Sequence, residues 1–166
     1  MAHHEHEAEA PAQLDIGVLT LSDTRSEEED RSGKILRDLL IAAGHTVRRY
    51  AVIREDPEGI RTTLEAWLGE RLDAIVTNGG TGLTSRDGTI EVARRLMQKE
   101  LPGFGEIFRL VSYHQIGGAA MLTRATAGLA SGRILICLPG STAAVRLAAQ
   151  RLILPNLGHM VREARR

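Results

Sequence analysis

A glycine-rich segment follows a short apolar run and carries the residue types that bind phosphate. Gly79, Gly80 and Gly82, with Thr81 among them, come directly after the run Ala74–Thr77 and Asn78. Glycine lets the backbone adopt positive φ angles, and successive N–H groups in such a turn can surround an anion. The N-terminus of a following helix adds a partial positive charge. The segment therefore predicts a phosphate-binding loop, and the alternative is a tight strand-to-helix turn without a ligand.

The spacing of these glycines differs from that of two common nucleotide-binding motifs. The segment T-N-G-G-T-G-L-T-S-R-D at Thr77–Asp87 has neither the glycine spacing of the dinucleotide fingerprint nor the lysine of the P-loop. The sequence therefore argues against a Rossmann dehydrogenase and against a P-loop NTPase. Without such a motif, the loop alone does not identify its ligand.

Three carboxylates near this loop suggest a magnesium ion. Asp87 follows the glycines, while Glu55 and Asp56 follow the predicted strand Thr46–Ile53. A carboxylate close to bound phosphates repels them unless a cation lies between, and phosphoryl chemistry commonly uses carboxylate-held Mg²⁺. The alternatives are structural. Asp87 could cap the helix that follows it, and the other two residues could form an exposed first helical turn.

Two further loops carry polar groups of the same kind. Ser22 and Asp23 end the first predicted strand, where they could contact a ligand or form a turn. Pro139, Gly140 and Ser141 follow the last predicted strand and resemble a tight loop with a helix cap. A capped helix start also offers N–H groups to an anion. Both loops are therefore candidates for substrate binding.

Alternating strand-like and helix-like patterns place all of these loops at one edge. Such an alternation is typical of βαβ units, with a parallel sheet and helices on both of its faces. Ligands in such sheets bind beyond the carboxyl ends of the strands, so we expect one edge to carry the chemistry. The predicted strands are Asp15–Leu21, Thr46–Ile53, Ala74–Thr77 and Arg133–Leu138; helical patterns begin at Asp30 and Pro57 and cover Thr89–Gln98, Gly103–His114, Thr142–Ile153 and Asn156–Ala164.

The composition is that of an ordinary globular protein. With 166 residues the chain is long enough for one domain, and its 21 basic and 21 acidic residues favour neither nucleic acid nor a membrane as partner. The one cysteine, Cys137, lies among aliphatic residues and is expected to be inert in the core. No apolar run approaches the roughly 20 residues that span a bilayer, and no secretory pattern is found. We expect a cytoplasmic protein.

The first residues differ in composition from the rest of the chain. Residues 1–13, M-A-H-H-E-H-E-A-E-A-P-A-Q, have too little apolar surface to fold. They predict a disordered tail before a single domain at residues 14–166. His3, His4 and His6 could bind a divalent metal, but a flexible tail without enclosing ligands would hold it weakly.

Short motifs occur along nearly the whole of the expected domain. They are T-L-S-D at Thr20–Asp23, D-R-S-G at Asp30–Gly33, T-N-G-G-T-G-L-T-S-R-D at Thr77–Asp87, P-G-F-G-E at Pro102–Glu106, L-T-R-A at Leu122–Ala125 and L-P-G-S at Leu138–Ser141. In this order and spacing, the chain resembles the molybdopterin adenylyltransferase family, the MogA/MoaB group of molybdenum cofactor biosynthesis proteins. The resemblance is closest to the MoaB branch.

The resemblance implies an enzyme that activates molybdopterin with ATP and Mg²⁺. In this reaction the terminal phosphate of molybdopterin attacks the α-phosphate of ATP, giving adenylyl-molybdopterin and pyrophosphate. Asp87 matches the acidic residue of the R-D motif that positions Mg·ATP, and Glu55 falls in an acidic loop where relatives often carry aspartate. Thr81 and its glycines match the pterin and phosphate loop. Ser22 and Ser112 match hydroxyl positions that line the pocket.

The same resemblance implies a fold and partners. We expect a three-layer αβα fold with a mostly parallel sheet, a homotrimer or in some members a hexamer, and a molybdate insertase as partner. Two other functions stay open. The chain could be a catalytically silent carrier of molybdopterin, or a nucleotide pyrophosphatase built on a related fold.

Overall fold

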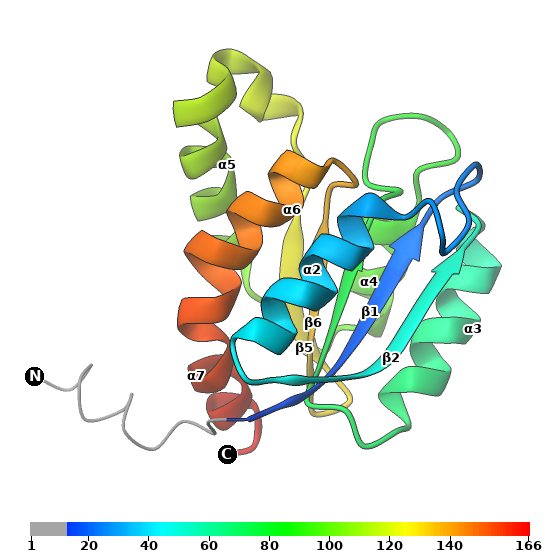
Figure 1. The fold of residues 1–166 in the computed structure, drawn as a ribbon, viewed down its shortest axis with the longest axis vertical. Coiled ribbons are helices and arrows are strands. Elements are labelled where there is room, and N and C mark those ends of the chain that lie inside the picture. The colour runs from blue at the N-terminus through cyan, green and yellow to red at the C-terminus, as the bar shows by residue number, and fades with distance from the viewer. Residues whose placement is uncertain (1–12) are drawn as a thin grey trace, which may run out of the picture.

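The computed structural model describes residues 13–166, which form one sheet between layers of helices (Figure 1). Its strands are β1 (Asp15–Leu21), β2 (Thr46–Ile53), β3 (Ala74–Asn78), β4 (Lys99–Glu100), β5 (Thr126–Ala130) and β6 (Arg133–Leu138). Their order in the sheet is β2-β1-β3-β6-β5-β4. The first four are parallel to one another, whereas β5 and β4 are antiparallel to their neighbours. The predicted α/β fold with a mostly parallel sheet is confirmed.

Helices cover both faces of this sheet. One face is covered by α2 (Arg31–Ala42), α6 (Thr142–Ala148) and α7 (Leu154–Ala164), and the other by α3 (Pro57–Leu68) and α4 (Thr89–Leu96). Helix α5 (Pro102–Ile116) packs against β5, a 3₁₀ helix (Gly117–Leu122) follows it, and a π-helical turn (Ala149–Ile153) joins α6 to α7. No helix within residues 13–166 is long and apolar enough to cross a membrane.

The predicted tail, residues 1–13, lies outside the described residues except for Gln13. The histidines proposed there as a weak metal site lie outside them as well. Gln13 is exposed, and its side-chain amide donates a hydrogen bond of 2.9 Å to the hydroxyl of Thr46 at the start of β2.

The two antiparallel strands are the part of the sheet that the sequence patterns do not predict. Strand β5 reads T-A-G-L-A, and its small residues have little β propensity. It is joined to β6 by Ser131 and Gly132, whose φ angles of 48° and 73° define the type I′ turn of a tight hairpin. The predicted helix Thr89–Gln98 ends earlier, at Leu96, because the chain then enters β4.

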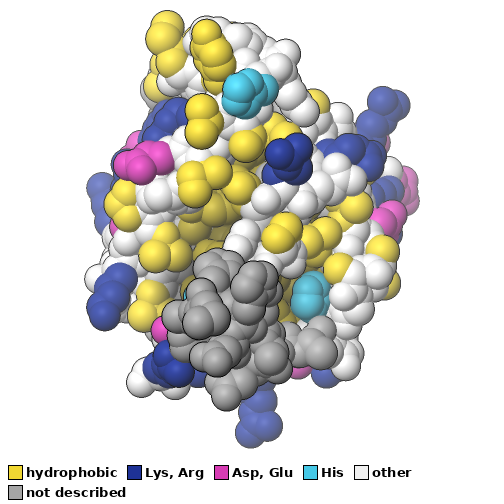
Figure 2. Space-filling model, turned by 90° about the vertical axis from the view of Figure 1, so that its left-hand side faces the viewer, with side chains coloured by type: hydrophobic (Ala, Val, Ile, Leu, Met, Phe, Trp, Pro, Cys, Tyr) yellow, Lys and Arg dark blue, Asp and Glu magenta, His cyan; other side chains and the backbone are white. Residues whose placement is uncertain are grey.

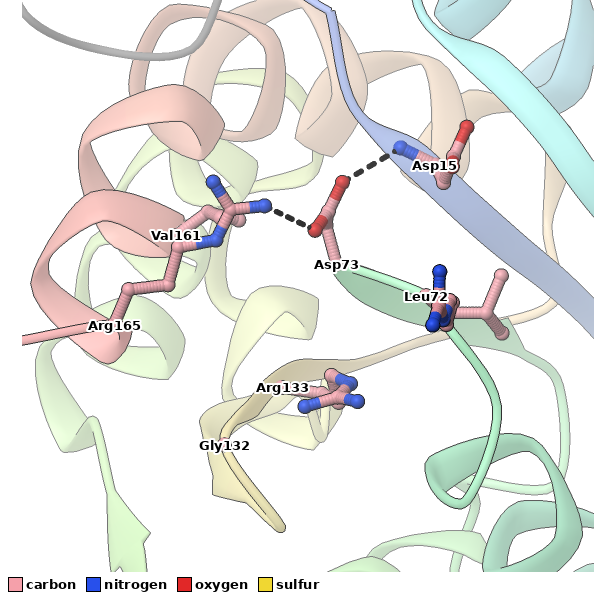
Figure 3. A pocket seen from close by; sticks show the side chains of 8 residues that line it. Asp15, Leu72, Asp73, Gly132, Arg133, Val161 and Arg165 are labelled. Carbon is pink, nitrogen blue, oxygen red and sulfur yellow. Dashed lines mark hydrogen bonds and ion pairs between the residues drawn. The ribbon is translucent and has the colours of Figure 1, made fainter.

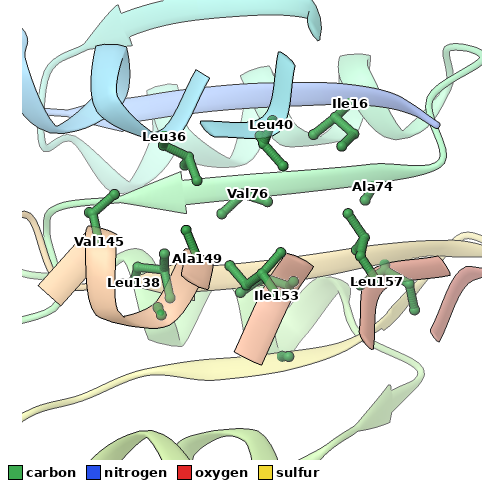
Figure 4. Packing of buried hydrophobic residues seen from close by; sticks show 14 of the residues in the cluster. Ile16, Leu36, Leu40, Ala74, Val76, Leu138, Val145, Ala149, Ile153 and Leu157 are labelled. Atoms are coloured by element: carbon green, nitrogen blue, oxygen red, sulfur yellow. The ribbon is translucent and has the colours of Figure 1, made fainter. Parts of the chain in front are cut away.

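The larger hydrophobic core lies between the sheet and the helices α2, α6 and α7 (Figure 4). Aliphatic side chains of the central strands, such as Ile16 and Val76, meet Leu40 and Ile153, and all four are fully buried. Cys137 faces the second core, on the side of α3 and α4, and burial raises the pKa of its thiol to about 12. The expectation of an inert core cysteine fits this environment.

A buried carboxylate joins the first helix to two strands. Asp30 is fully buried and caps α2, because its side chain accepts a hydrogen bond of 2.9 Å from the backbone N–H of Gly33. The hydroxyls of Thr20 in β1 and Tyr50 in β2 both donate to Asp30 Oδ2 over 2.6 Å. Burial, and then the hydrogen bond to Asp30, raise the pKa of the Tyr50 phenol.

This network reaches a third strand through Asn78, the last residue of β3. The amide Nδ2 of Asn78 donates to Thr20 Oγ1 over 2.9 Å, and its Oδ1 accepts from Ser32 Oγ over 2.8 Å. All of these side chains except that of Tyr50 are buried. The backbone after Asn78 is the glycine-rich loop, so the network determines where that loop leaves the sheet.

We expect Asp30→Ala to lower the free energy of unfolding by about 3 kcal/mol or more, because it leaves several buried donors without an acceptor. Urea unfolding followed by circular dichroism measures the loss. Asp38→Ala is the matched control. Its carboxylate is exposed and, within residues 13–166, is bonded only to Arg37, so the change should stay within about 0.5 kcal/mol. Equal effects of the two substitutions would contradict a structural role for the buried network.

Candidate functional site

The glycine-rich loop adopts the backbone conformations that the sequence predicts at two positions. The φ angles are 98° at Gly79 and 64° at Gly80, in the left-handed region that favours glycine. A Cβ at Gly79 would collide with the carbonyl oxygen of Leu21, and one at Gly80 with the hydroxyl of Thr89. Gly82 has no positive φ angle. It is needed for space, because a Cβ there would lie 2.7 Å from a carboxylate oxygen of Asp87.

Two amides of this loop have no acceptor within residues 13–166. Gly79 donates to the carbonyl of Leu138 over 3.0 Å, and Thr89 donates to the carbonyl of Gly80 over 3.1 Å. Gly80 and Thr81 are buried, yet their own N–H groups have no such partner. Because buried amides are nearly always paired, these two donors suit an acceptor from outside the chain, such as a phosphate oxygen.

Asp87 is held by the loop rather than by the helix after it. Its Oδ2 accepts hydrogen bonds from the hydroxyl of Thr84, at 2.6 Å, and from the Thr84 backbone N–H, at 2.9 Å. The hydroxyl of Thr84 above all, then the backbone amides of Thr84 and Gly82 and the charge of Arg124, lower the pKa of Asp87. Helix α4 starts at Gly88 as N-cap with no side-chain cap, so the helix-cap alternative for Asp87 is wrong.

Glu55 faces two other carboxylates. Burial, and then the negative charges of Asp23 and Asp87, raise the pKa of Glu55, while Arg86 acts in the opposite direction. The backbone N–H of Glu55 donates to Asp23 Oδ1 over 3.1 Å, and Asp23 forms an ion pair of 2.5 Å with Arg86. The loops after β1, β2 and β3 thus bring three acidic residues and one arginine together. This agrees with the expectation that loops at the carboxyl ends of parallel strands meet at one edge of the sheet.

Asp23, Glu55 and Arg86 line a cleft of about 680 Å³, whereas Asp87 does not. A cleft of this size is typical of small-molecule sites. Asp56 lies in the cleft wall and caps α3, since its carboxylate accepts from the backbone N–H of Gly59 over 2.8 Å. Asp56 therefore stabilises the first turn of α3, as the structural alternative predicted. Its role as a metal ligand stays a prediction. The cleft is lined by Asp23, Ile53, Arg54, Glu55, Asp56, Pro57, Gly59, Thr63, Ser85 and Arg86.

A smaller hollow of about 120 Å³ collects three more of the predicted residues. Ser112 of α5, which is buried, lines it together with Pro139 and Ser141. The hydroxyl of Ser141 also caps α6 by accepting from the backbone N–H of Ala144 over 3.2 Å. Gly140 lies close to the glycine-rich loop, because a Cβ there would be 3.2 Å from the Cα of Gly79.

Ser22 does not line either of these two hollows. Its hydroxyl accepts hydrogen bonds from the backbone N–H groups of Thr24 and Arg25, at 3.3 and 3.1 Å, so it forms a turn. Ser22 therefore acts as a turn former, which is one of the two roles predicted for it. Its contact with substrate stays a prediction.

Sequence reasoning did not assign a role to Arg124. Its guanidinium donates to the carbonyl oxygen of Gly82 over 2.9 Å and pairs with Glu91 in α4. It thereby connects the chain before β5 to the glycine-rich loop and places a positive charge near Asp87. The signal that could have found it is the motif L-T-R-A at Leu122–Ala125, which contributed to the resemblance without a stated function.

Known proteins share this architecture over nearly its whole length. The profile of a family described as "Probable molybdopterin binding domain" matches residues 17–159. The chain belongs to this family. Among curated relatives, the molybdenum cofactor biosynthesis protein B of Bacillus anthracis is 46% identical over 168 residues, covering 100% of this chain and 99% of its own.

Solved structures of the family agree with the fold. A crystal structure of molybdenum cofactor biosynthesis protein B has a TM-score of 0.89 and 46% identity, with 94% of this chain and 98% of that chain covered. The tungsten cofactor synthesizing protein MoaB of Pyrococcus furiosus has a TM-score of 0.86 and 37% identity, with 95% and 100% covered. This molybdopterin-binding-domain fold therefore extends over the loops that carry the candidate residues.

The electrostatic coupling within the cleft can be tested by titration. We expect Asp87→Asn to lower the pKa of Glu55, because it removes a negative charge that disfavours ionisation of the Glu55 carboxyl. Carbon-13 NMR of the glutamate carboxyl groups across pH 3–8 measures this pKa. Asp56→Asn is the control, since the charge of Asp56 does not contribute to the shift.

The direction of the Glu55 pKa shift also predicts an effect on stability. Because the pKa of Glu55 is raised in the folded state, its ionisation opposes folding at neutral pH, and this penalty disappears as the pH falls through that pKa. Glu55→Gln should accordingly stabilise the protein at pH 7 and leave its stability unchanged at the acid end of the titration. An unchanged Glu55 pKa in Asp87→Asn would show that the carboxylates do not interact.

Proposed function

We propose that the chain catalyses the Mg·ATP-dependent adenylylation of molybdopterin in molybdenum cofactor biosynthesis. One observation carries this proposal: the loops after β1, β2 and β3 meet through the bonds of Asp23 to Glu55 and Arg86, beside a glycine-rich loop with two amides that have no acceptor within residues 13–166. Relatives named molybdenum cofactor biosynthesis protein B support the pathway, and the description of the family supports a pterin as ligand.

The triphosphate of ATP fits the edge between the cleft and the glycine-rich loop. The free N–H groups of Gly80 and Thr81 offer two hydrogen bonds to phosphate oxygens, in a place where few waters compete. Arg54 and Arg86 line the cleft and supply positive charge.

Carboxylates in the loops after β1, β2 and β3 are suited to a magnesium ion. Glu55, Asp23 and Asp87 present only oxygen donors, which Mg²⁺ prefers, and their mutual repulsion would be relieved by a divalent cation. Within residues 13–166 no group of three or more metal-binding side chains is arranged to enclose a metal. In this proposal Mg²⁺ would take one or two of these carboxylates and complete its coordination with waters and substrate phosphates. When bound, Mg²⁺ would neutralise charge on the phosphates.

In the proposed reaction a phosphate oxygen of molybdopterin forms a bond to the α-phosphorus of ATP. The bond from that phosphorus to the oxygen bridging to the β-phosphate breaks, and pyrophosphate leaves with the electron pair. The chain contributes orientation and charge, since the loop amides hold phosphate and Asp87 stays ionised through its bonds to Thr84. No covalent intermediate with the protein is required.

Molybdopterin itself is assigned to the side of the loop opposite the cleft. There Ser112, Pro139 and Ser141 border a hollow of about 120 Å³, and the hydroxyl groups provide polar contacts for a pterin edge. The hollow is small, so it would receive only part of the substrate. The rest would lie over the glycine-rich loop, between the hollow and the cleft.

An apolar surface supports assembly into a homo-oligomer. Hydrophobic side chains of α5 and the 3₁₀ helix after it are exposed, and Figure 2 shows the face on which apolar side chains gather. Monomeric proteins rarely leave many large apolar side chains exposed on one face. We infer that further copies of the chain cover it, as a trimer or hexamer. The patch consists of Leu101, Ile107, Leu110, Tyr113, Ile116, Met121 and Leu122.

The activity is tested with purified protein, molybdopterin, Mg²⁺ and ATP labelled at the α-phosphate. We expect labelled adenylyl-molybdopterin that depends on Mg²⁺, and a loss of about 100-fold or more in Asp87→Asn, which removes the charge next to the phosphates. Asp38→Asn, an exposed carboxylate on α2, is the matched control and should retain full activity.

The same assay separates the alternatives. Tight molybdopterin binding without any adenylylated product would identify a carrier. Release of pyrophosphate or phosphate from ATP in the absence of molybdopterin would instead identify a nucleotide pyrophosphatase. The cytoplasmic location and the insertase partner stay predictions from the sequence.

The assembly is tested by the matched pair Ile107→Asp and Ile41→Asp. These isoleucines are 50% and 52% exposed, but only Ile107 lies in the apolar patch of α5. We expect Ile107→Asp to dissociate the oligomer toward monomers, because it would bury a charge at the subunit contact. Light scattering after gel filtration measures the molar mass. Intact oligomers in Ile107→Asp would place the contact elsewhere.

A further inference from the structure

A hollow at the opposite edge of the sheet collects arginine side chains (Figure 3). It has a volume of about 330 Å³ and lies where β1 and β6 begin and where α7 ends. A second hollow of about 450 Å³ adjoins it and shares Asp15, Arg71 and Leu72. We call the two together the arginine hollow. Its charged residues are Asp15, Arg48, Arg49, Glu70, Arg71, Asp73, Arg133 and Arg165.

The carboxylates of the arginine hollow are already paired. Asp73 accepts from the guanidinium of Arg165 over 2.5 Å and from the backbone N–H of Asp15 over 2.8 Å, as Figure 3 shows. The side chain of Asp15 pairs with Arg48 over 2.9 Å. Glu70, the third carboxylate, forms two hydrogen bonds of 2.8 and 2.9 Å with Arg49. Every negative charge of the hollow therefore has its own arginine.

Two arginines remain without a counter-charge. Arg71 has no hydrogen-bond or ion-pair partner within residues 13–166. Arg133 donates only to neutral acceptors, the carbonyl oxygens of Ser131 at 3.3 Å and Glu70 at 3.1 Å. Its Nε is buried and has no acceptor in this part of the chain. A buried charged donor without an acceptor is costly, which favours a partner from outside the described residues.

We propose that the arginine hollow binds a small oxyanion, a phosphate or carboxylate group, between Arg71 and Arg133. Guanidinium groups match the geometry of such anions, because two N–H donors can bind two oxygens at once. Five arginines face three carboxylates, so the hollow carries an excess of two positive charges, which favours an anion as ligand. The tight turn at Gly132 keeps Arg133 at the rim. This site is separate from the candidate catalytic edge and does not depend on the proposed function.

The oxyanion could come from two sources. One is a phosphate or small carboxylic acid in solution. The other is the chain itself, since Glu5, Glu7 and Glu9 precede Asp15 closely in the sequence. The chemistry is the same in both cases, and the two sources are distinguished by removing the chain's own carboxylates.

The test is a titration of the full-length chain with inorganic phosphate, in which NMR chemical shifts of backbone amides report binding. The readouts are Gly132 and Asp73 at the arginine hollow, with Gly80 and Gly82 as reporters of the catalytic edge. We expect saturable shifts at Gly132 and Asp73, and affinity about 10-fold lower or more in Arg71→Gln. Arg95→Gln changes an exposed arginine of α4 that does not line the hollow, and it should leave the affinity unchanged.

Further variants decide between the sources. A triple variant, Glu5→Gln with Glu7→Gln and Glu9→Gln, should bind phosphate more tightly than the natural chain if those carboxylates occupy the hollow. Equal affinity in both chains would assign the site to an anion from solution. Arg133→Lys keeps the charge but lacks Nε, so it should also weaken binding. The proposal is overturned if phosphate shifts Gly132 in neither chain, or if it does so equally well in Arg71→Gln and Arg133→Lys.

Discussion

The buried carboxylate of Asp30 constrains the elements from which the candidate site is built. It accepts hydrogen bonds from α2, β1 and β2, and the connected side chains of Thr20 and Ser32 extend the network to Asn78 at the end of β3. A buried charge is stable only where its hydrogen bonds are made, so these elements cannot shift separately. The backbone that leaves Asn78 therefore always enters the glycine-rich loop from the same position, next to the ends of the neighbouring strands.

The parallel part of the fold was predictable because β1, β3 and β6 are almost wholly buried and therefore largely apolar. Strand β2 carries the exposed Arg48 and Arg49, and only its apolar end at residues 51–53 marks it in the same way. The antiparallel part was not, because β5 contains alanine and glycine and derives its stability from pairing with β6. The dipeptide Ser131-Gly132 was a usable turn signal. The end of α4 depends on Lys99 pairing with Leu129, which no local pattern reveals.

For the candidate site, the sequence predicted residue types better than interactions. Gly79 and Gly80 were recognised because only glycine adopts their backbone conformation without strain. For Asp87 the sequence left a cap and a charged role open, and the contact with Thr84 excludes the cap. Arg124 lies far along the chain from Gly82, so its contact exists only in the folded protein. The spacing of residues along the sequence does not predict contacts between positions so far apart.

The two outer strands of the sheet differ in a way that bears on how copies of this chain can associate. An outer strand exposes unpaired backbone groups, which can pair with a strand of another molecule and lead to aggregation. On one side β2 carries the exposed arginines Arg48 and Arg49, whose charges oppose such pairing. On the other side β4 has only two residues, Lys99 and Glu100, and both are charged. Neither border of the sheet can therefore be extended readily, so the edge strands disfavour the joining of copies of this chain into a continuous sheet.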